Sequence, residues 1–236
     1  MIRYRNIFLG VCLMCASLVA VSDELTIAKK SAQEAFKDDG VVRLLKAAIH
    51  KDTQEAKRLV TSGVNVNAIG EGGVTPLVWA LADHDVAAMK ILLDLGANPN
   101  QYVVDGVGPA VWLAAGGGHK EALKLLIDYG GDANIAYGNK SALMMAIGES
   151  HLDCAELLLQ HGADINYSKS LISALDMAML HVRFRDALWV LNHGYTHDLP
   201  MARRMLAREE PRLGDAKYKA QALDIVDRLL AEQQKK

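Results

Sequence analysis

The chain has 236 residues, of which 51% are hydrophobic, 23% are charged and 5 are Pro. This composition excludes a disordered chain and predicts one elongated domain with a sizeable core. The formal charge of −2 becomes −4 once residues 1–22 are removed, because Arg3 and Arg5 leave and no acid does. A mildly acidic chain without a basic stripe is a poor candidate for binding nucleic acid.

Residues 1–22 have the features of a secretory signal peptide. Arg3 and Arg5 precede the apolar run Ile7–Val21, and Ala20-Val21-Ser22 supplies small residues at a cleavage site before Asp23. The alternative is an uncleaved membrane anchor. The apolar run Ile7–Val21 has 15 residues, however, and a bilayer span needs about 20. A lipoprotein is a lesser alternative, since Val11 precedes Cys12 where a small residue is expected. We therefore expect export without membrane attachment after cleavage, to the periplasm in a Gram-negative host and otherwise by secretion.

The mature chain begins with a capping element. Residues 23–38 carry spaced apolar side chains among charged ones, which predicts a weakly amphipathic helix ending before Gly40. The next segment, Gly40–Asn67, places Lys46 and Arg58 where later segments are apolar. This polar substitution is typical of a terminal repeat, whose outer face meets water.

The stretch Thr75–Asn100 contains a pattern that recurs along the chain. A Gly closes a leucine-rich helix at spacings of 33, 34, 32 and 32 residues, at positions Gly63, Gly96, Gly130, Gly162 and Gly194. An Asn keeps the same step at Asn67, Asn100, Asn134 and Asn166. The pattern predicts an inner helix and an outer helix in each repeat. One inner helix begins at Thr75-Pro76, and each outer helix ends at the Gly. A fixed period of this length predicts stacked repeats of two short helices.

The motifs Thr75-Pro76-Leu77, Gly118-His119 and Gly162-Ala163-Asp164-Ile165-Asn166 resemble the ankyrin repeat. The resemblance covers about residues 39–198 as five repeats and implies an all-α solenoid whose units are joined by short hairpin-like connectors. It also implies a non-catalytic scaffold, because repeat folds host many binding tasks. The usual His after the Leu is absent here, so we expect looser turns and the same fold.

The C-terminal residues 199–236 follow a fifth copy that ends in Gly194-Tyr195-Thr196. Helices are expected over about residues 201–208 and 216–231, separated by Pro211 and Gly214. The second helix has an apolar face. We interpret the pair as a degenerate sixth unit that caps the stack.

Few residues are candidates for chemistry. After signal removal only Cys154 remains of three cysteines, which excludes an intramolecular disulfide. His151 lies three residues from Cys154 and could activate a thiol, although a buried structural Cys is favoured. His193 and His197 could share a metal only on one helix, which Gly194 should end. The Gly116-Gly117-Gly118 run lacks the Lys-Ser/Thr of a phosphate loop. We therefore expect no catalytic residue, no metal and no cofactor.

The resemblance places a partner on the connector tips and on the exposed side of the inner helices. Recurring Tyr residues near successive tips suit a protein interface, although surface Tyr is also common. Trp79 is expected in the core, whereas Trp112 occupies the position of the missing His. The predicted partner-binding residues are Glu71, Val74, Asp83, Tyr102, Asp105, Tyr137, Lys140, Glu149, Lys169 and His181.

The sequence therefore predicts an exported monomer that binds another protein, with no nucleic acid as partner. Ankyrin-like proteins with such signals include neutralising partners of secreted toxins, which makes an immunity or inhibitor role the more concrete hypothesis. The alternatives are an envelope assembly or stress-protection scaffold with several weak partners, and a thiol-dependent enzyme using Cys154 and His151.

Overall fold

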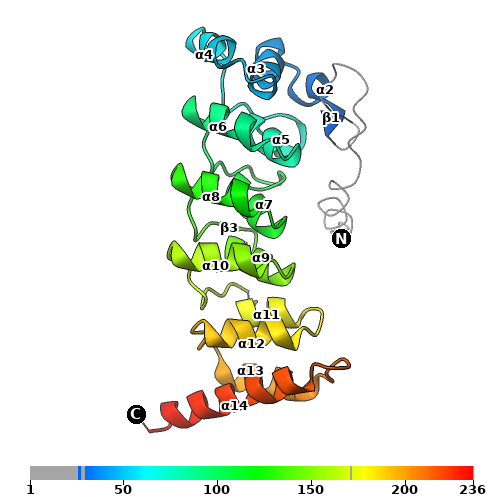
Figure 1. Ribbon diagram of the computed structural model, residues 1–236, viewed down its shortest axis with the longest axis vertical. Helices are drawn as coiled ribbons and strands as arrows, with labels where there is room; N and C mark the ends of the chain where they lie inside the picture. Colours follow the sequence, from blue (N-terminus) through cyan, green and yellow to red (C-terminus); the bar gives the residue numbers. More distant parts are fainter. Residues whose placement is uncertain (1–25, 28–29, 171, 236) are drawn as a thin grey trace. The chain divides into compact units, whose positions relative to one another are not determined.

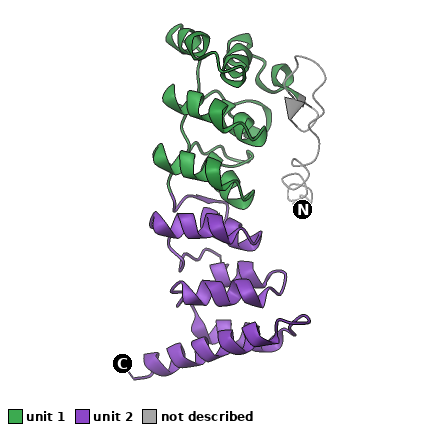
Figure 2. Ribbon diagram, viewed as in Figure 1, with its two compact units in different colours: residues 1–132 green, residues 133–236 purple. Residues whose placement is uncertain are grey.

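The computed structural model describes residues 26–27, 30–170 and 172–235. The chain divides into two compact units, Met1–Asp132 and Ala133–Lys236 (Figure 2). Within each unit, a repeat mainly contacts the repeats beside it. The predicted signal peptide lies outside the described residues. Within them, no helix is long and apolar enough to cross a membrane.

The N-terminal capping element is shorter than the sequence predicts. Helix α2 (Ala32–Phe36) follows two short antiparallel strands, β1 (Thr26–Ile27) and β2 (Lys30–Ser31), so a helix over all of residues 23–38 is wrong. Ser31 sets the helix start, since its Oγ accepts from the Glu34 N–H at 3.2 Å and the Glu34 carboxylate accepts from the Ser31 N–H at 2.8 Å. This reciprocal pairing satisfies two amide donors at the first turn.

The first unit stacks three helix pairs, each with an inner and an outer helix (Figure 1). A short 3₁₀ helix, η1 (Glu71–Gly73), precedes the second pair, and α2 packs against both η1 and α3. Outer helix α6 contacts α8, and inner helix α5 contacts α7. The pairs are α3 (Asp39–Ile49) with α4 (Thr53–Thr61), α5 (Pro76–Ala82) with α6 (Val86–Asp94), and α7 (Ala110–Gly116) with α8 (Lys120–Asp128).

The second unit contains the fourth and fifth repeats and the cap. A hairpin of β3 (Ala136–Tyr137) and β4 (Lys140–Ser141) leads into the fourth repeat. The repeats are α9 (Ala142–Gly148) with α10 (Leu152–Gln160), and α11 (Ala174–Met179) with α12 (Phe184–Asn192). Helices α13 (Leu199–Arg208) and α14 (Ala216–Gln233) pack together, and α14 covers α12. The last two helices therefore occupy the place expected for a cap.

Local sequence signals explain where the inner helices begin. The Thr75 Oγ1 accepts from the Val78 N–H at 3.2 Å, and Pro76 occupies the first helical turn. Ser141 and Ser173 accept in the same way at the starts of α9 and α11. A hydroxyl at this position satisfies an amide that has no partner inside the helix. The predicted start at Thr75-Pro76 is confirmed.

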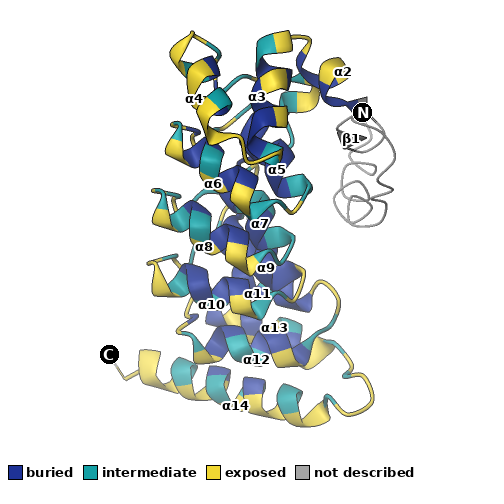
Figure 3. Cartoon of the chain, turned by 45° about the horizontal axis from the view of Figure 1, so that its top comes forward, coloured by how far each residue is buried: buried dark blue, intermediate teal, exposed yellow. Residues whose placement is uncertain are grey.

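The core follows the buried faces of the paired helices, and their other faces are exposed (Figure 3). In the terminal repeat, Lys46 and Arg58 are exposed, as expected for an end repeat. Arg58 and Arg43 form ion pairs with Glu55 and lower the pKa of that carboxyl to about 2. The outer face of this repeat is therefore a solvated charged surface.

The recurring Asn residues link consecutive repeats within each unit. The Asn100 Nδ2 donates to the Gly130 carbonyl at 2.9 Å, and its Oδ1 accepts from the Asp132 N–H at 2.8 Å. In the second unit, Asn134 forms the equivalent pair of bonds with Gly162 and Asp164. The Asn that recurs with the repeat period thus uses its side chain to join the backbones of consecutive repeats.

Replacing Asn100 by Ala is expected to lower the free energy of unfolding by roughly 1–2 kcal/mol, because two backbone groups lose their side-chain partner. Chemical denaturation monitored by circular dichroism measures the effect. Asn139→Ala, at an exposed position between β3 and β4, is the control and should change the free energy little. Equal midpoints for the two variants would contradict a bridging role.

The turns between inner and outer helices each contain one residue in the left-handed region. These residues are Lys51, His84, Gly118, Ser150 and Val182, with φ between 54° and 70°. Val182 is the least suited to this conformation, because a branched Cβ meets the following carbonyl. The fifth repeat therefore stores backbone strain in its turn.

Val182→Gly should raise the free energy of unfolding by about 0.5–1 kcal/mol, because relief of the strain exceeds the added entropy of Gly. The reciprocal change, Gly118→Val, introduces the strain at the equivalent turn and should destabilise. Both effects are read from thermal unfolding. Destabilisation by Val182→Gly would show that the Val side chain contributes more by packing than it costs in strain.

Candidate partner-binding surface

The candidate thiol pair is part of the helix packing. Cys154 is fully buried in the first turn of α10, and its backbone N–H lies 3.0 Å from the carbonyl of His151. His151 is the residue before the helix and is only partly exposed. A reactive thiol needs access to its substrate, so this placement favours the structural interpretation of Cys154.

The histidine pair does not share a helix. His193 ends α12, stacks on Trp189 with ring centroids 3.8 Å apart, and places its Nε2 3.0 Å from a carboxylate oxygen of Glu156. His197 lies beyond Gly194 in the following turn. Among the described residues, no group of three or more His, Cys, Asp or Glu could hold a metal ion.

The glycine run forms a turn, and one groove of the second unit is lined without a nucleophile. Residues 116–118 end α7 and form the turn to α8. A groove of about 570 Å³ between α12 and α14 is lined by residues that include Leu188, Ile225 and Arg228, but no His, Cys, Ser or Thr. The groove therefore supplies no nucleophile.

A polar cluster of His181, Arg183, Arg185 and Asp186, which the sequence alone indicates as a solvated face, is partly buried. Asp186 is only 3% exposed, accepts from the Ser150 hydroxyl at 2.7 Å and lies 2.7 Å from the Arg183 Nε. Arg183 also donates through Nη2 to the Ile147 carbonyl at 3.1 Å and to the Gly148 carbonyl. The solvated-face interpretation is wrong for these two residues, which join α12 to the end of α9.

The predicted partner-binding residues of the first unit lie on two connectors and one turn. We name residues 68–74 the first connector and residues 101–108 the second connector. Glu71 begins η1 and is exposed, while Val74 is half-buried. Tyr102 is 53% exposed, and Asp105 is exposed with a φ of 55°.

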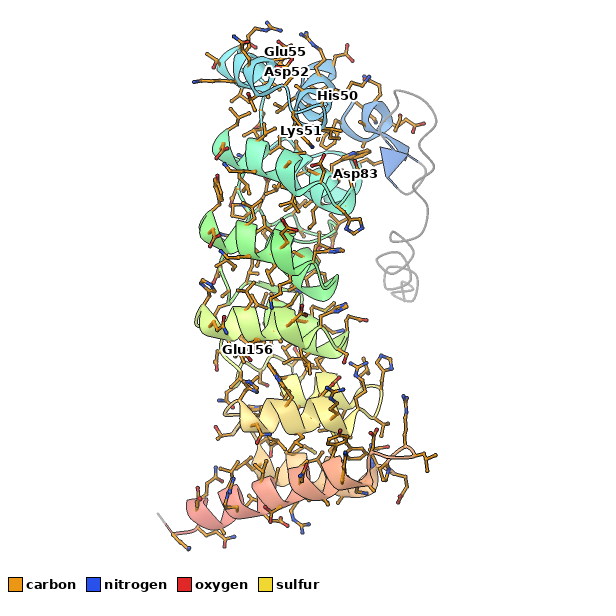
Figure 4. The ribbon with its side chains drawn as sticks, in the orientation of Figure 1. His50, Lys51, Asp52, Glu55, Asp83 and Glu156 are labelled. Atoms are coloured by element: carbon orange, nitrogen blue, oxygen red, sulfur yellow. The ribbon has the colours of Figure 1, made fainter. Side chains whose placement is uncertain are left out.

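Asp83 lies at the end of α5, away from the connectors along the same inner helix (Figure 4). Burial, reinforced by the negative charge of Asp85, raises the pKa of the Asp83 carboxyl above its usual range. Asp85 itself is ion-paired with Lys51 from the preceding turn. The turns of the first unit thus hold a charge cluster separate from the connector tips.

In the second unit the structure brings three predicted residues together. Tyr137 and Lys140 face each other across the β3–β4 hairpin, and the Lys169 Nζ donates to the Gly138 carbonyl at 3.1 Å. Burial lowers the pKa of the Lys140 ammonium, while the negative charge of Glu149 opposes the shift. His181 lies apart from these residues, exposed after α11.

The sequence interpretation missed two exposed apolar residues. Ile69 on the first connector is 58% exposed, and Val104 on the second connector is 75% exposed. The available signal was their position in Gly-rich connectors, where apolar side chains have no helix face to bury. We refer to Ile69, Val104 and Tyr102 together as the apolar surface of the two connectors.

The repeats and the fold of this chain are similar to those of known proteins. Residues 105–169 match the family model described as ankyrin repeats (3 copies). The crystal structure of the human ASB11 ankyrin repeat domain is similar, with a TM-score of 0.59 at 23% identity over 79% of this chain and 82% of that chain. No curated protein sequence gives a significant match. Residues 105–169 thus contain ankyrin repeats, and the structural similarity shows that the chain has the fold of an ankyrin repeat domain.

Proposed function

We propose that this chain is an exported, non-catalytic binding protein and that its partner is a secreted toxin, which it neutralises. Ankyrin repeats generally bind other proteins, and the repeat scaffold presents connector tips for that purpose. Burial of Cys154 supports a role without thiol chemistry. The signal-like residues 1–22 support export.

The observation that carries the proposal is the apolar surface on the first and second connectors. Among the described residues, the strongly exposed large hydrophobic side chains number six, and three of them, Ile69, Tyr102 and Val104, lie on these two connectors. Clustered exposed apolar side chains mark binding surfaces more often than scattered ones do. Tyr is also enriched among residues that contribute most to interfaces.

The test is affinity capture of the full-length chain, carrying a C-terminal tag, from its native host. The binding variant is Tyr102→Ser/Val104→Ser, which removes apolar area at exposed positions. The matched control is Glu121→Ala/Lys124→Ala on the exposed face of outer helix α8. We expect one partner in near-equal amount with the wild-type chain and the control, and its loss with the binding variant.

Equal recovery by all three proteins, or equal loss from both variants, would overturn the connector surface as the binding site. A recovered partner that shows no toxicity when expressed alone would overturn the inhibitor role. Mass spectrometry of the purified chain tests export separately, because cleavage predicts an N-terminus at Asp23. An intact Met1 in the mature protein would contradict that step.

A second candidate function is a scaffold with several partners, and the charges of the connectors favour it. The second connector carries Asp105 and no Lys or Arg, whereas the connectors at residues 135–140 and 167–172 carry Lys140 and Lys169 and no acid. Two tip surfaces of opposite charge suit two different partners. Capture of several proteins in unequal amounts, each lost with a different connector variant, would favour the scaffold over the inhibitor.

A further inference from the structure

The first and second connectors form one surface, because their backbones are in direct contact. A Cβ added at Gly73 would lie 2.6 Å from the Cα of Gly106 and 3.0 Å from a methyl carbon of Val103. The Gln101 side chain also donates through Nε2 to the Asn67 carbonyl at 3.0 Å. Ile69, Tyr102 and Val104 therefore belong to adjoining segments of the first unit.

The N-terminal element supports this surface on one side. A Cβ added at Gly70 would lie 2.8 Å from the Ala35 carbonyl oxygen, so the first connector is pressed against α2. Two glycines thus allow the close approach of α2 and the two connectors. A partner would meet a preorganised surface, which lowers the ordering cost of binding.

The charged side chains of the two connectors are all negative. Residues 59–89 and 91–119 contain no Lys or Arg, so both connectors and the inner helices α5 and α7 lack a cationic side chain. The connectors carry exposed carboxylates at Glu71 and Asp105. The cations of these two repeats lie on the outer helices, where Lys90 and Lys124 pair with Asp94 and Asp128. Lys37 ends α2, the helix that contacts η1 of the first connector.

We propose that the first and second connectors bind a partner segment whose apolar side chain is flanked by Lys or Arg. The apolar side chain contacts Ile69, Tyr102 and Val104, and the cations approach Glu71 and Asp105. This inference rests on the proposed protein-binding function and specifies the chemistry of the partner. The charge pattern selects a basic segment over an acidic one, because juxtaposed like charges oppose association.

The test uses random twelve-residue peptides displayed on phage and selected on the immobilised full-length chain. Selection on the wild-type chain should enrich Lys or Arg next to an apolar residue. The test variant Glu71→Gln/Asp105→Asn removes two charges with little change of shape, and Asn tolerates the left-handed conformation of residue 105. The control Glu121→Gln/Asp128→Asn removes two charges from outer helix α8 of the same unit.

For a synthetic peptide of the enriched sequence, the test variant should weaken binding roughly tenfold, since two partly screened charge pairs are lost. The same affinity should fall as ionic strength rises. The control should keep the wild-type affinity and its salt dependence. The variant Ile69→Ser/Val104→Ser should also lose the peptide, which separates the apolar contribution from the charges.

Enrichment of acidic or purely apolar peptides would overturn the inference, as would equal affinities of the test variant and the control. These outcomes differ from failure of the proposed function. A partner that is captured through Tyr102 and Val104, but binds the charge-neutralised variant equally well, leaves protein binding in place and removes only the basic segment. Circular dichroism of each variant confirms that the compared proteins are folded.

Discussion

Trp79→Ala is expected to lower the free energy of unfolding by about 3–5 kcal/mol, the range for truncating a buried Trp. Trp79 is 2% exposed on inner helix α5, and its ring lies 5.9 Å from that of Phe36 with an interplanar angle of 54°. The side chain therefore joins α2 to the second repeat. Its loss leaves a cavity that α2 and the first connector cannot fill without moving.

Denaturant unfolding followed by circular dichroism measures this effect, because the change also removes a fluorophore. Trp112→Ala is the matched control, since Trp112 lies on the next inner helix but is only partly buried. A partly buried side chain loses less area on truncation, so the control should lose less stability. An unchanged midpoint for Trp79→Ala would refute its place in the core.

Asp186→Ala is expected to cost about 3–5 kcal/mol, because it leaves the charge of Arg183 without its buried partner. Asp186 accepts from the Ser150 hydroxyl, and Arg183 reaches two carbonyls at the end of α9. The Arg183 Nε makes no aligned hydrogen bond with Asp186, so that 2.7 Å contact is an ion pair. Removing the carboxylate thus disturbs the junction of the fourth and fifth repeats.

Thermal and chemical unfolding of Asp186→Ala test this prediction. Asp224→Ala, at an exposed position on α14, is the control and should stay within about 0.5 kcal/mol of the parent. The double variant Arg183→Met/Asp186→Leu should recover most of the lost stability, because replacing both partners by apolar groups leaves no unpaired charge. A double variant as unstable as Asp186→Ala would point to the Ser150 bond as the dominant contribution.

The fifth repeat shows how a degenerate motif keeps its place in the stack. Where the second and fourth repeats have Ala after the closing Gly, this repeat has Tyr195. Tyr195 is 3% exposed and donates from its hydroxyl to the Ser173 Oγ at 3.0 Å. Burial raises the pKa of Tyr195 to about 12. The larger side chain thus fills the core and contacts the residue that begins α11.

The two connectors show which part of the candidate binding surface the sequence could predict and which part it could not. The sequence placed Tyr102 and Asp105 at a tip correctly, because Gly-rich segments between helices lie on the surface. It did not identify Ile69 and Val104, since exposure of an apolar side chain in a connector depends on how neighbouring backbones pack. The contact between Gly73 and Gly106 brings the two connectors together, and the sequence does not show that contact.

The sequence by itself determined the repeat period, the helix starts and the turn glycines. Thr75-Pro76 begins a helix and Gly96, with a φ of 93°, ends one. Both signals act on the backbone of their own segment and need no distant partner. Tertiary structure alone decided that Asp186 is buried and that the first and second connectors lie against each other. Those outcomes depend on contacts between residues about one repeat apart, such as Ser150 with Asp186, and burial of a polar group is settled only when its neighbours are in place.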